Sequence, residues 1–431
     1  MNAEQGETDA MSGVKPDPPT YRLFLSAVGL ALRPTSRRWW TSLGIATLAS
    51  LGFAAEPLDV TATLSTEARG FLDAPANPVA FQGIDASVAL EVEVAWENAS
   101  RDQSLIITPF VRYDAQDDDR RYGDLREFLF LQTGDTWDLR VGVSKVFWGV
   151  TESQHLVDVI NQTDFREGID GEAKLGQPMI NFDWLTDAAG TIGFYYLPYA
   201  RKREFPGTGG RLRPAPAVPL GAARWTGSGG QWHSNWAVRW AHSIGAFDIG
   251  LYHFDGYNRE ARFGFDPATN QVRPIYDLMT QQGLDLQFTH EAWLWKAEVL
   301  SRQTDFDDHI ASVVGFEYTF YGIFETALDV GALVEHHHDG RAGLAAGGFN
   351  DDWFVGSRLA WNDSQDTSAI VGVILDADHS STSWRVEFQR RLGEDYRLDI
   401  EAQFINADRA DLGLSPLAND SFVRVELGRY F

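Results

Sequence analysis

Acidic side chains dominate one segment of the chain, residues 148–176, which begins with the dipeptide Trp148-Gly149. Its ionisable residues are Glu152, His155, Asp158, Asp164, Arg166, Glu167, Asp170, Glu172 and Lys174. The carboxylates outnumber the basic groups, so the segment has a negative field that attracts cations wherever it lies beside a path for solutes. The alternative is an exposed surface loop whose charges are solvated and have no function.

A second group, Glu335-His336-His337-His338-Asp339, combines imidazoles with carboxylates, the side chains that bind transition metals. Consecutive residues of a strand point to opposite faces, which disfavours convergence on one ion. We therefore expect no metal site and no cofactor. The sequence has no Gly-x-Ser-x-Gly motif and no spacing that marks a nucleophile and its base, so we expect no enzymatic activity.

The elements that must position these residues are extended strands. From Leu58 onward apolar and polar residues alternate with period two, as at Val88, Leu90, Val92 and Val94, between clusters of Gly, Asn, Asp and Pro. Many runs reach about ten residues, the length that crosses a bilayer at a tilt, whereas strands of soluble sandwiches are usually shorter.

We count about eighteen strands, an even number as a closed antiparallel barrel requires; sixteen is the alternative, because 177–197 and 257–290 alternate weakly. The predicted strands are 58–70, 84–98, 103–115, 121–132, 136–147, 177–185, 190–197, 231–243, 246–256, 275–289, 292–303, 309–320, 323–336, 350–362, 366–377, 380–392, 394–406 and 419–431. Short connections alternate with long ones near 71–83, 148–176, 198–230, 257–274, 337–349 and 407–418. The sequence predicts an all-β protein, a single transmembrane antiparallel β-barrel with short periplasmic turns and long extracellular loops.

Polar positions of such strands face the lumen, and many of them are charged. The basic ones are Arg112, Arg140, Arg239, Arg358, Arg385 and Arg397, and the acidic ones are Glu317, Glu325, Asp329, Glu387, Asp399 and Glu401. Facing ladders of opposite charge would create a transverse field that orients polar solutes in a wet lumen. In a narrow or plugged barrel the same groups would pair across strands.

One loop is basic: Arg201-Lys202-Arg203, followed by Arg211 and Arg213. On the outside of a barrel, localised cations could bind the phosphates of lipopolysaccharide. The Pro-rich continuation at 214–219 is also consistent with a stiff, extended connection.

Composition narrows the classes of protein. The chain has 431 residues, no Cys and a formal net charge of -25, which disfavours a nucleic-acid partner. Residues Arg37 and Arg38 precede an apolar run that ends near Ala54, the pattern of a secretory signal peptide. We expect a signal peptide at 37–54, a barrel at 55–431, and for 1–36 either an unfolded extension or a misassigned start.

The last residues place Val423, Val425, Leu427 and Phe431 on one face of a strand. A chain that ends on an aromatic residue after such alternation resembles the closing strand of bacterial outer-membrane β-barrels. The resemblance implies that Phe431 belongs to the signal read by the barrel-assembly machinery. Arg429 departs from the pattern, which usually has an apolar or aromatic residue there.

The Trp148-Gly149 turn with Asn161 and Asp164 downstream resembles a segment of porin-like outer-membrane proteins of proteobacteria whose substrates are undefined. Thr151-Glu152 and the missing Pro-containing turn depart from the pattern. The resemblance implies a channel in the bacterial outer membrane, surrounded by lipid and lipopolysaccharide, for passive passage of small polar solutes. The acidity favours cations, with 148–176 as the pore constriction.

Other functions remain open on the sequence alone. A non-conducting barrel, such as an adhesin, a scaffold or a lipopolysaccharide-handling enzyme, would show the same strand pattern. A polysaccharide exporter would also do so, although an anionic polysaccharide requires a more basic lumen than this one. The oligomeric state is likewise open.

Overall fold

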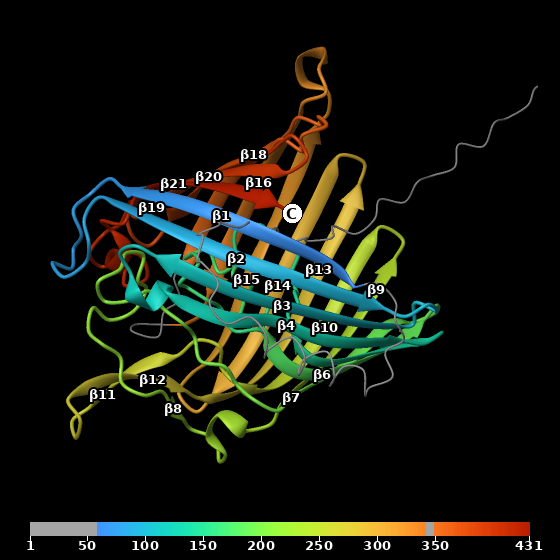
Figure 1. Cartoon of the computed structure of the whole chain (residues 1–431), viewed down its shortest axis with the longest axis horizontal. Helices are drawn as coiled ribbons and strands as arrows, with labels where there is room; N and C mark the ends of the chain where they lie inside the picture. The colour runs from blue at the N-terminus through green and yellow to red at the C-terminus, as the bar shows by residue number, and fades with distance from the viewer. Residues whose placement is uncertain (1–57, 342–348) are drawn as a thin grey trace, which may run out of the picture.

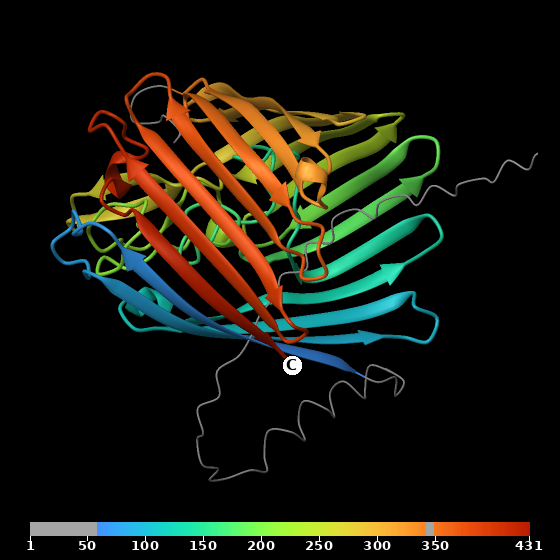
Figure 2. The ribbon, with the colours of Figure 1, turned by 90° about the horizontal axis from the view of Figure 1, so that it is seen from above.

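A closed 18-stranded antiparallel barrel forms the body of the computed structural model, which describes residues 58–341 and 349–431 (Figures 1 and 2). The barrel strands are β1 (Asp59–Phe71), β2 (Ile84–Glu97), β3 (Gln103–Asp114), β4 (Tyr122–Thr133), β5 (Trp137–Ser144), β6 (Gln177–Thr186), β7 (Gly190–Leu197), β9 (Asn235–Ile244), β10 (Phe247–Tyr257), β13 (Leu278–His290), β14 (Trp293–Thr304), β15 (Asp308–Phe320), β16 (Asp329–Asp339), β17 (Asp351–Ala360), β18 (Ser368–Asp376), β19 (Thr382–Leu392), β20 (Tyr396–Asn406) and β21 (Phe422–Tyr430). The count of eighteen is thereby confirmed. The expected extension and signal peptide, 1–36 and 37–54, lie outside the described residues.

The last strand closes the barrel, because β21 pairs antiparallel with β1 from Thr63↔Tyr430 to Phe71↔Phe422. The Phe431 amide donates to the Ala62 carbonyl at 2.9 Å, so the final residue extends this ladder. Since every strand edge is paired in the ring, the barrel leaves no free edge for unwanted strand addition.

The outward face of the terminal strand is apolar. Val423, Val425 and Leu427 are exposed, whereas residues between them point inward. Arg429 is the exception, and its guanidinium lies over the rings of Tyr396 and Phe431 at 5.6 Å and 4.5 Å. Stacking on aromatic rings near a strand end lets its charged group stay at the polar boundary of an apolar belt, which explains an arginine at this position.

The connections separate into two ends of the barrel. One end, here the loop end, carries 72–83, 115–121, 145–176, 198–234, 258–277, 305–307, 340–341, 349–350, 377–381 and 407–421. The other, the turn end, carries 98–102, 134–136, 187–189, 245–246, 291–292, 321–328, 361–367 and 393–395. The expected grouping of long loops at one end and short turns at the other is confirmed.

One predicted strand begins too early. Residues 321–328 form a turn around the 3-10 segment η3 (Ile323–Glu325), in which Phe324 and Glu325 have φ of 57° and 59°. A left-handed backbone cannot continue a strand, and β16 begins only at Asp329. The prediction that Glu325 faces the lumen is therefore wrong, because its side chain is exposed in the turn.

Three short strands at the loop end were not predicted. They are β8 (Arg224–Trp225), β11 (Arg262–Asp266) and β12 (Gln271–Tyr276), and they form a small separate sheet (Figure 1). Further 3-10 segments are η1 (Asp118–Arg120), η2 (Gly230–Trp232) and η5 (Ser415–Leu417). Across 58–341 and 349–431, no helix is long and apolar enough to cross a membrane.

Candidate functional site in the barrel lumen

The connection between β5 and β6, residues 145–176 and here called the inner loop, folds into the lumen. Its base is closed by Asn161, whose Nδ2 donates to the Ser144 and Leu175 carbonyls at 2.9 Å each. The Asn161 Oδ1 accepts from the Val146 amide at 2.8 Å. Asn161, which belongs to the segment that resembles porin-like proteins, thus connects the two ends of the inner loop.

Trp148 anchors the start of the inner loop on one wall. It is 4% exposed, and its ring lies 5.4 Å from that of Tyr195 on β7 and 5.0 Å from that of Tyr252 on β10. The next residue, Gly149, has φ of 142°, and a Cβ there would meet Glu298 Oε1 at 3.0 Å. The Trp-Gly pair therefore combines an aromatic anchor with a close backbone approach that a side chain would obstruct.

Glu298 on β14 binds the loop after this point. Its carboxylate accepts from the amides of Val150, Thr151 and Val157 at 2.7, 3.0 and 3.1 Å, and from the Thr151 hydroxyl at 2.7 Å. Glu298 is fully buried. A buried carboxylate that accepts several hydrogen bonds from one segment fixes that segment firmly.

Glu335 on β16 makes a second attachment beside it. Its carboxylate accepts from the amides of Glu152 and Ser153 at 2.8 and 2.9 Å, and from the Ser153 hydroxyl. Glu152 in turn pairs with Arg358 on β17. Together with Glu298, these contacts hold residues 150–157 against β14, β16 and β17.

Apolar residues of the inner loop complete this attachment. Val157, Val159 and Ile160 are at most 3% exposed. They form one buried cluster with Trp148, Met179, Tyr195, Leu197, Ala237, Tyr252, Phe254 and Met279. The lumen is therefore filled by packed side chains along β6, β7, β9, β10 and β13, and these strands line no open passage at that level.

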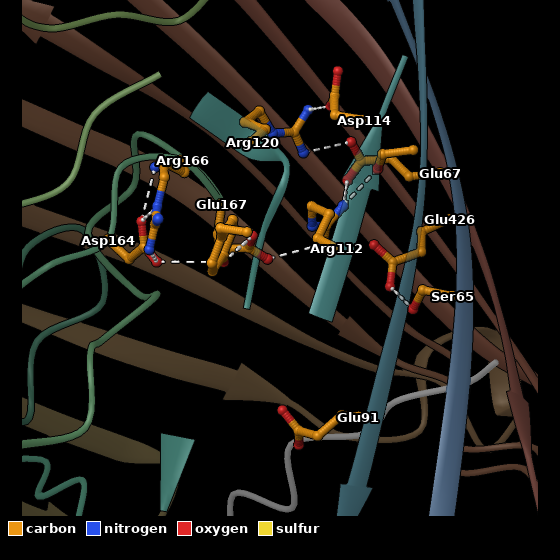
Figure 3. A network of polar contacts seen from close by, with 12 residues as sticks. Ser65, Glu67, Glu91, Arg112, Asp114, Arg120, Asp164, Arg166, Glu167 and Glu426 are labelled. Atoms are coloured by element: carbon orange, nitrogen blue, oxygen red, sulfur yellow. Dashed lines mark hydrogen bonds and ion pairs between the residues drawn. The ribbon is translucent and has the colours of Figure 1, made fainter. Parts of the chain in front are cut away.

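The second half of the loop binds the opposite wall through Glu167. Its carboxylate pairs with Arg112 at 2.9 Å (Figure 3). It also pairs with Arg126 at 3.5 Å and accepts from the Tyr122 hydroxyl at 2.6 Å. Burial alone would raise the pKa of Glu167, but the guanidinium groups of Arg112, Arg126 and Arg120 outweigh it and lower the pKa to about 2.

Glu67 on β1 is the centre of the wall that Glu167 binds. Its carboxylate lies within 3.6 Å of guanidinium nitrogens from Arg69, Arg112, Arg120 and Arg424 (Figure 3 shows Arg112 and Arg120). The side chain of Glu67 is 2% exposed. Arg120 and Arg424 also pair with other carboxylates of the wall, so the four arginines and their acidic partners form a rigid charged network, in which Arg112 binds Glu167 of the inner loop.

The other predicted loop residues divide into anchors and exposed groups. Asp170 pairs with Arg385 on β19 at 2.8 Å. Pairs within the loop are Asp158–Lys174 at 3.1 Å, Asp164–Arg166 at 2.7 Å and His155–Glu172 at 3.0 Å. Asp158 and Asp164 are almost fully buried, whereas the Glu172 side chain is 51% exposed. Glu172 and Glu152 are thus the loop carboxylates that best reach water.

The inner loop leaves one side of the lumen less covered than the other. Inward-facing residues of β13–β16 at most 2% exposed are Gln281, Glu298, Leu300, Ala311, Val313, Leu333, Glu335 and His337. By contrast, the side chains of Arg358, Arg385 and Glu387 on β17 and β19 are 40%, 32% and 41% exposed. Water therefore reaches the lumen wall along β17–β20, where the side chains of Arg397 and Asp399 on β20 are each 26% exposed.

Most predicted lumen charges face inward and are paired. The pairs are Arg140–Asp183, Arg239–Asp285, Arg358–Glu317, Arg385–Glu387, Arg397–Asp399 and Arg424–Glu401. Asp329 instead lies at the turn end, where it accepts from the Gly322 amide at 2.9 Å. Four of these six pairs join different strands, as the narrow-barrel interpretation expects, whereas Arg385–Glu387 lies within β19 and Arg397–Asp399 within β20. Some of the pairs remain partly exposed.

The basic loop turns its arginines toward the protein. Arg201 pairs with Asp124 on β4 at 3.0 Å, and Arg211 pairs with Asp420 at 2.6 Å. The Arg203 guanidinium lies 4.8 Å from the Phe165 ring centroid, and Arg213 donates to the Pro216 carbonyl. These contacts lay residues 201–213 across the loop end, and they do not favour the interpretation as a grip for lipopolysaccharide phosphates.

The histidine run alternates between faces. His337 faces inward and its Nε2 lies 2.6 Å from the Ser153 hydroxyl, while His336 lies on the outward face beside Asp351 and Trp353. In the part of the chain that the structure describes, no three His, Asp or Glu residues are grouped so that they could hold a metal ion.

Sequence reasoning identifies only some of the residues that fix the inner loop. The predicted lumen residues Arg112, Arg358 and Arg385 bind it, but Glu67 is not predicted as a lumen residue and Glu335 is considered only as a metal ligand. Alternation places both in the lumen, but their partners are distant in sequence or are backbone amides, which carry no sequence signal. Gly149 was the one available signal, since a glycine within a charged, otherwise bulky segment marks a close approach.

The lowered pKa of Glu167 predicts that its attachment resists acid. A carboxyl with a depressed pKa in the folded protein contributes stability above its unfolded pKa and loses it as the pH falls through the folded value. We expect the thermal unfolding temperature to show no Glu167-dependent change between about pH 7 and pH 5, and a Glu167-dependent fall between about pH 4.5 and pH 2. A fall between about pH 7 and pH 5 in the wild type that is absent from Glu167→Gln would contradict this.

Comparisons with known proteins support the fold and go no further. No protein-family model matches the chain, and no curated protein matches it. Among solved structures, a BenF-like porin from Pseudomonas fluorescens Pf-5 is similar with a TM-score of 0.51 and 11% identity, covering 87% of this chain and 98% of the porin. Wzi of Escherichia coli, an outer-membrane protein involved in group 1 capsule assembly and a carbohydrate-binding β-barrel, is similar with a TM-score of 0.53 and 12% identity, covering 90% of this chain and 87% of Wzi. The chain therefore has the β-barrel fold that these two outer-membrane proteins share.

Proposed function

We propose that the chain is a porin-like channel of the bacterial outer membrane that lets small polar solutes pass by diffusion, with a preference for cations. The observation that carries the proposal is the inner loop, which is attached to both walls and leaves the β17–β20 side of the lumen accessible to water. A loop that narrows a water-filled barrel sets the rate at which solutes pass and the electric field that they meet. Passage requires no covalent chemistry, so we do not assign an enzymatic activity.

The route of the solute follows the half-exposed strip of charges. From the loop end it would run between Glu152 and Glu172 of the inner loop and the wall that carries Arg358, Arg385 and Glu387. The arginines of this strip are paired with acidic side chains. The exposed carboxylates therefore keep the electrostatic potential along the route negative. Asp158, Asp164 and Glu167 are buried in pairs and act here as anchors of the loop.

Removing the exposed carboxylates should reduce the preference for cations. We expect the double variant Glu172→Gln, Glu387→Gln to shift the reversal potential under a KCl gradient toward zero, with little change in conductance. The matched control is Asp118→Asn, Asp366→Asn, which removes the same charge from exposed acids in two connections between strands. Equal reversal potentials for the two double variants would rule out this route.

A second function rests on the attachment of the loop to both walls. A barrel whose lumen is crossed by a firmly held loop could serve as a binding surface that does not conduct, and its fold is also that of Wzi, a carbohydrate-binding barrel. This candidate predicts no current from inserted protein. It would also make the loop end the surface that contacts a saccharide.

The proposed setting follows from the outward face. An apolar belt with rings such as Trp293, Trp295 and Tyr318 near the turn end suits the hydrocarbon and headgroup layers of an outer membrane. In that setting the surrounding partners are lipid and lipopolysaccharide. The terminal Phe431 would then serve the barrel-assembly machinery as the resemblance implies.

A further inference from the structure

Several arginines surround a single carboxylate at the loop end of the lumen. Glu260, in the connection 258–277, pairs with Arg302 near the end of β14 at 3.2 Å and with Arg341, which follows β16, at 2.5 Å. Partial burial would raise the pKa of Glu260, but Arg341, Arg302 and Arg203 outweigh it and hold that pKa well below its usual range. Three connections of the barrel therefore meet around this group.

Positive charge exceeds negative charge in this cluster, which consists of Arg203, Arg302, Arg341 and Glu260. In the part of the chain that the structure describes, the only further carboxylate that pairs with one of these arginines is Asp339, which binds Arg341. Within 58–341 and 349–431, Arg203 forms no ion pair, and its Nε donates to Gln162 Oε1 at 3.1 Å.

Neighbouring acids do not remove this excess. Asp158 pairs with Lys174, and Glu204 pairs with Lys202, so each is already neutralised by a lysine. Three guanidinium groups thus face two carboxylates, in a chain whose formal net charge is -25. A local cationic centre in an acidic protein concentrates anions at that place.

Water reaches the cluster at the carboxylate itself. The Glu260 side chain is 41% exposed, whereas those of Arg302 and Arg341 are 8% and 14% exposed. The guanidinium groups are thus held by the protein while the group they bind faces solvent. Arginine forks match the planar carboxylate in two-point contact, so this arrangement can accept a carboxylate from solution in place of Glu260.

We infer that the arginine cluster recognises the carboxylate of a small solute at the loop end, and that Glu260 occupies the site as an internal competitor. The inference goes beyond the proposed channel, because recognition at this cluster does not require that solute crosses the barrel. According to this inference, the loop end binds solutes that carry an anionic group. The strip along β17–β20 separately determines whether cations or anions carry the current.

The test is calorimetric titration of the refolded protein in detergent micelles with malonate. Glu260→Gln removes the competitor and should tighten malonate binding by about tenfold or more over the wild type. The control is Glu204→Gln, which removes the same charge from the nearby acid that pairs with Lys202. Equal malonate affinities for Glu260→Gln and Glu204→Gln would overturn the inference.

Two further titrations keep the result decisive. If Glu260→Gln does not refold, Arg203→Gln should lose malonate binding in an otherwise wild-type chain, and Lys202→Gln should retain it; equal retention overturns the inference. Inorganic phosphate is titrated in parallel, and tighter binding of phosphate than of malonate would also overturn it, since the site would then suit a phosphate group. All titrations use protein in detergent micelles, so their result does not depend on whether the barrel conducts ions.

Discussion

Replacing Glu298 with leucine is expected to raise the single-channel conductance severalfold. The carboxylate accepts three backbone hydrogen bonds and one hydroxyl bond from residues 150–157, and leucine of similar size accepts none. Hydrogen bonds to a charged group contribute about 1.5–3 kcal/mol each, so their joint loss should free this half of the inner loop. The conductance is measured in planar bilayers at one salt concentration.

The matched control is Asp285→Asn on β13, because Asp285 is opposite Glu298 in the sheet register. Asp285 is also buried and inward-facing, but it pairs with Arg239 of the wall and not with the inner loop. It should leave the conductance near that of the wild type. If Glu298→Leu inserts normally and conducts like Asp285→Asn, then residues 150–157 do not limit the passage.

Replacing Glu67 with glutamine is expected to cause the largest loss of stability of any single substitution in the lumen. It removes the one carboxylate that lies within 3.6 Å of guanidinium nitrogens from Arg69, Arg112, Arg120 and Arg424. Removing one partner of a buried ion pair costs about 3–5 kcal/mol, because the remaining charge stays uncompensated. Urea unfolding of the refolded barrel, followed by tryptophan fluorescence, measures the loss.

An exposed pair provides the comparison. Glu97 and Arg101 form an ion pair with side chains 54% and 82% exposed, so Glu97→Gln should change the free energy of unfolding by less than about 1 kcal/mol. Comparable losses for the two variants would show that the Glu67 network is screened by water. In that case the wall around Arg112 would not be the rigid surface to which Glu167 binds.

The strands could be predicted closely because successive side chains of each strand face two different environments, the outside of the barrel and its lumen. The outward positions of β21, such as Val423 and Leu427, are apolar, while Arg424 and Glu426 between them face the lumen. The contrast between the two faces shows both the two-residue period of a strand and the number of residues over which the strand continues. It fails at 321–328, where Phe324, Thr326 and Leu328 alternate but the left-handed backbone prevents pairing. It also fails for β8, β11 and β12, which are too short to show a period.

The candidate site could be predicted in composition but not in arrangement. The acidic character of 148–176 was readable, yet Asp158 and Glu167 prove to be buried anchors, and only their partners reveal this. Arg112 is 55 residues from Glu167. Which inward side chains meet a loop depends on the stagger of neighbouring strands around the ring, and one sequence does not specify that stagger.

The central claim is that the barrel conducts along the β17–β20 side of the inner loop. Its most direct test is the single-channel current of purified, refolded protein in a planar bilayer under a KCl gradient. We predict stepwise conductance with a reversal potential on the cation-selective side, raised severalfold in Glu298→Leu. Inserted, folded protein that gives no current steps in either form would contradict the claim and favour a non-conducting, carbohydrate-binding barrel.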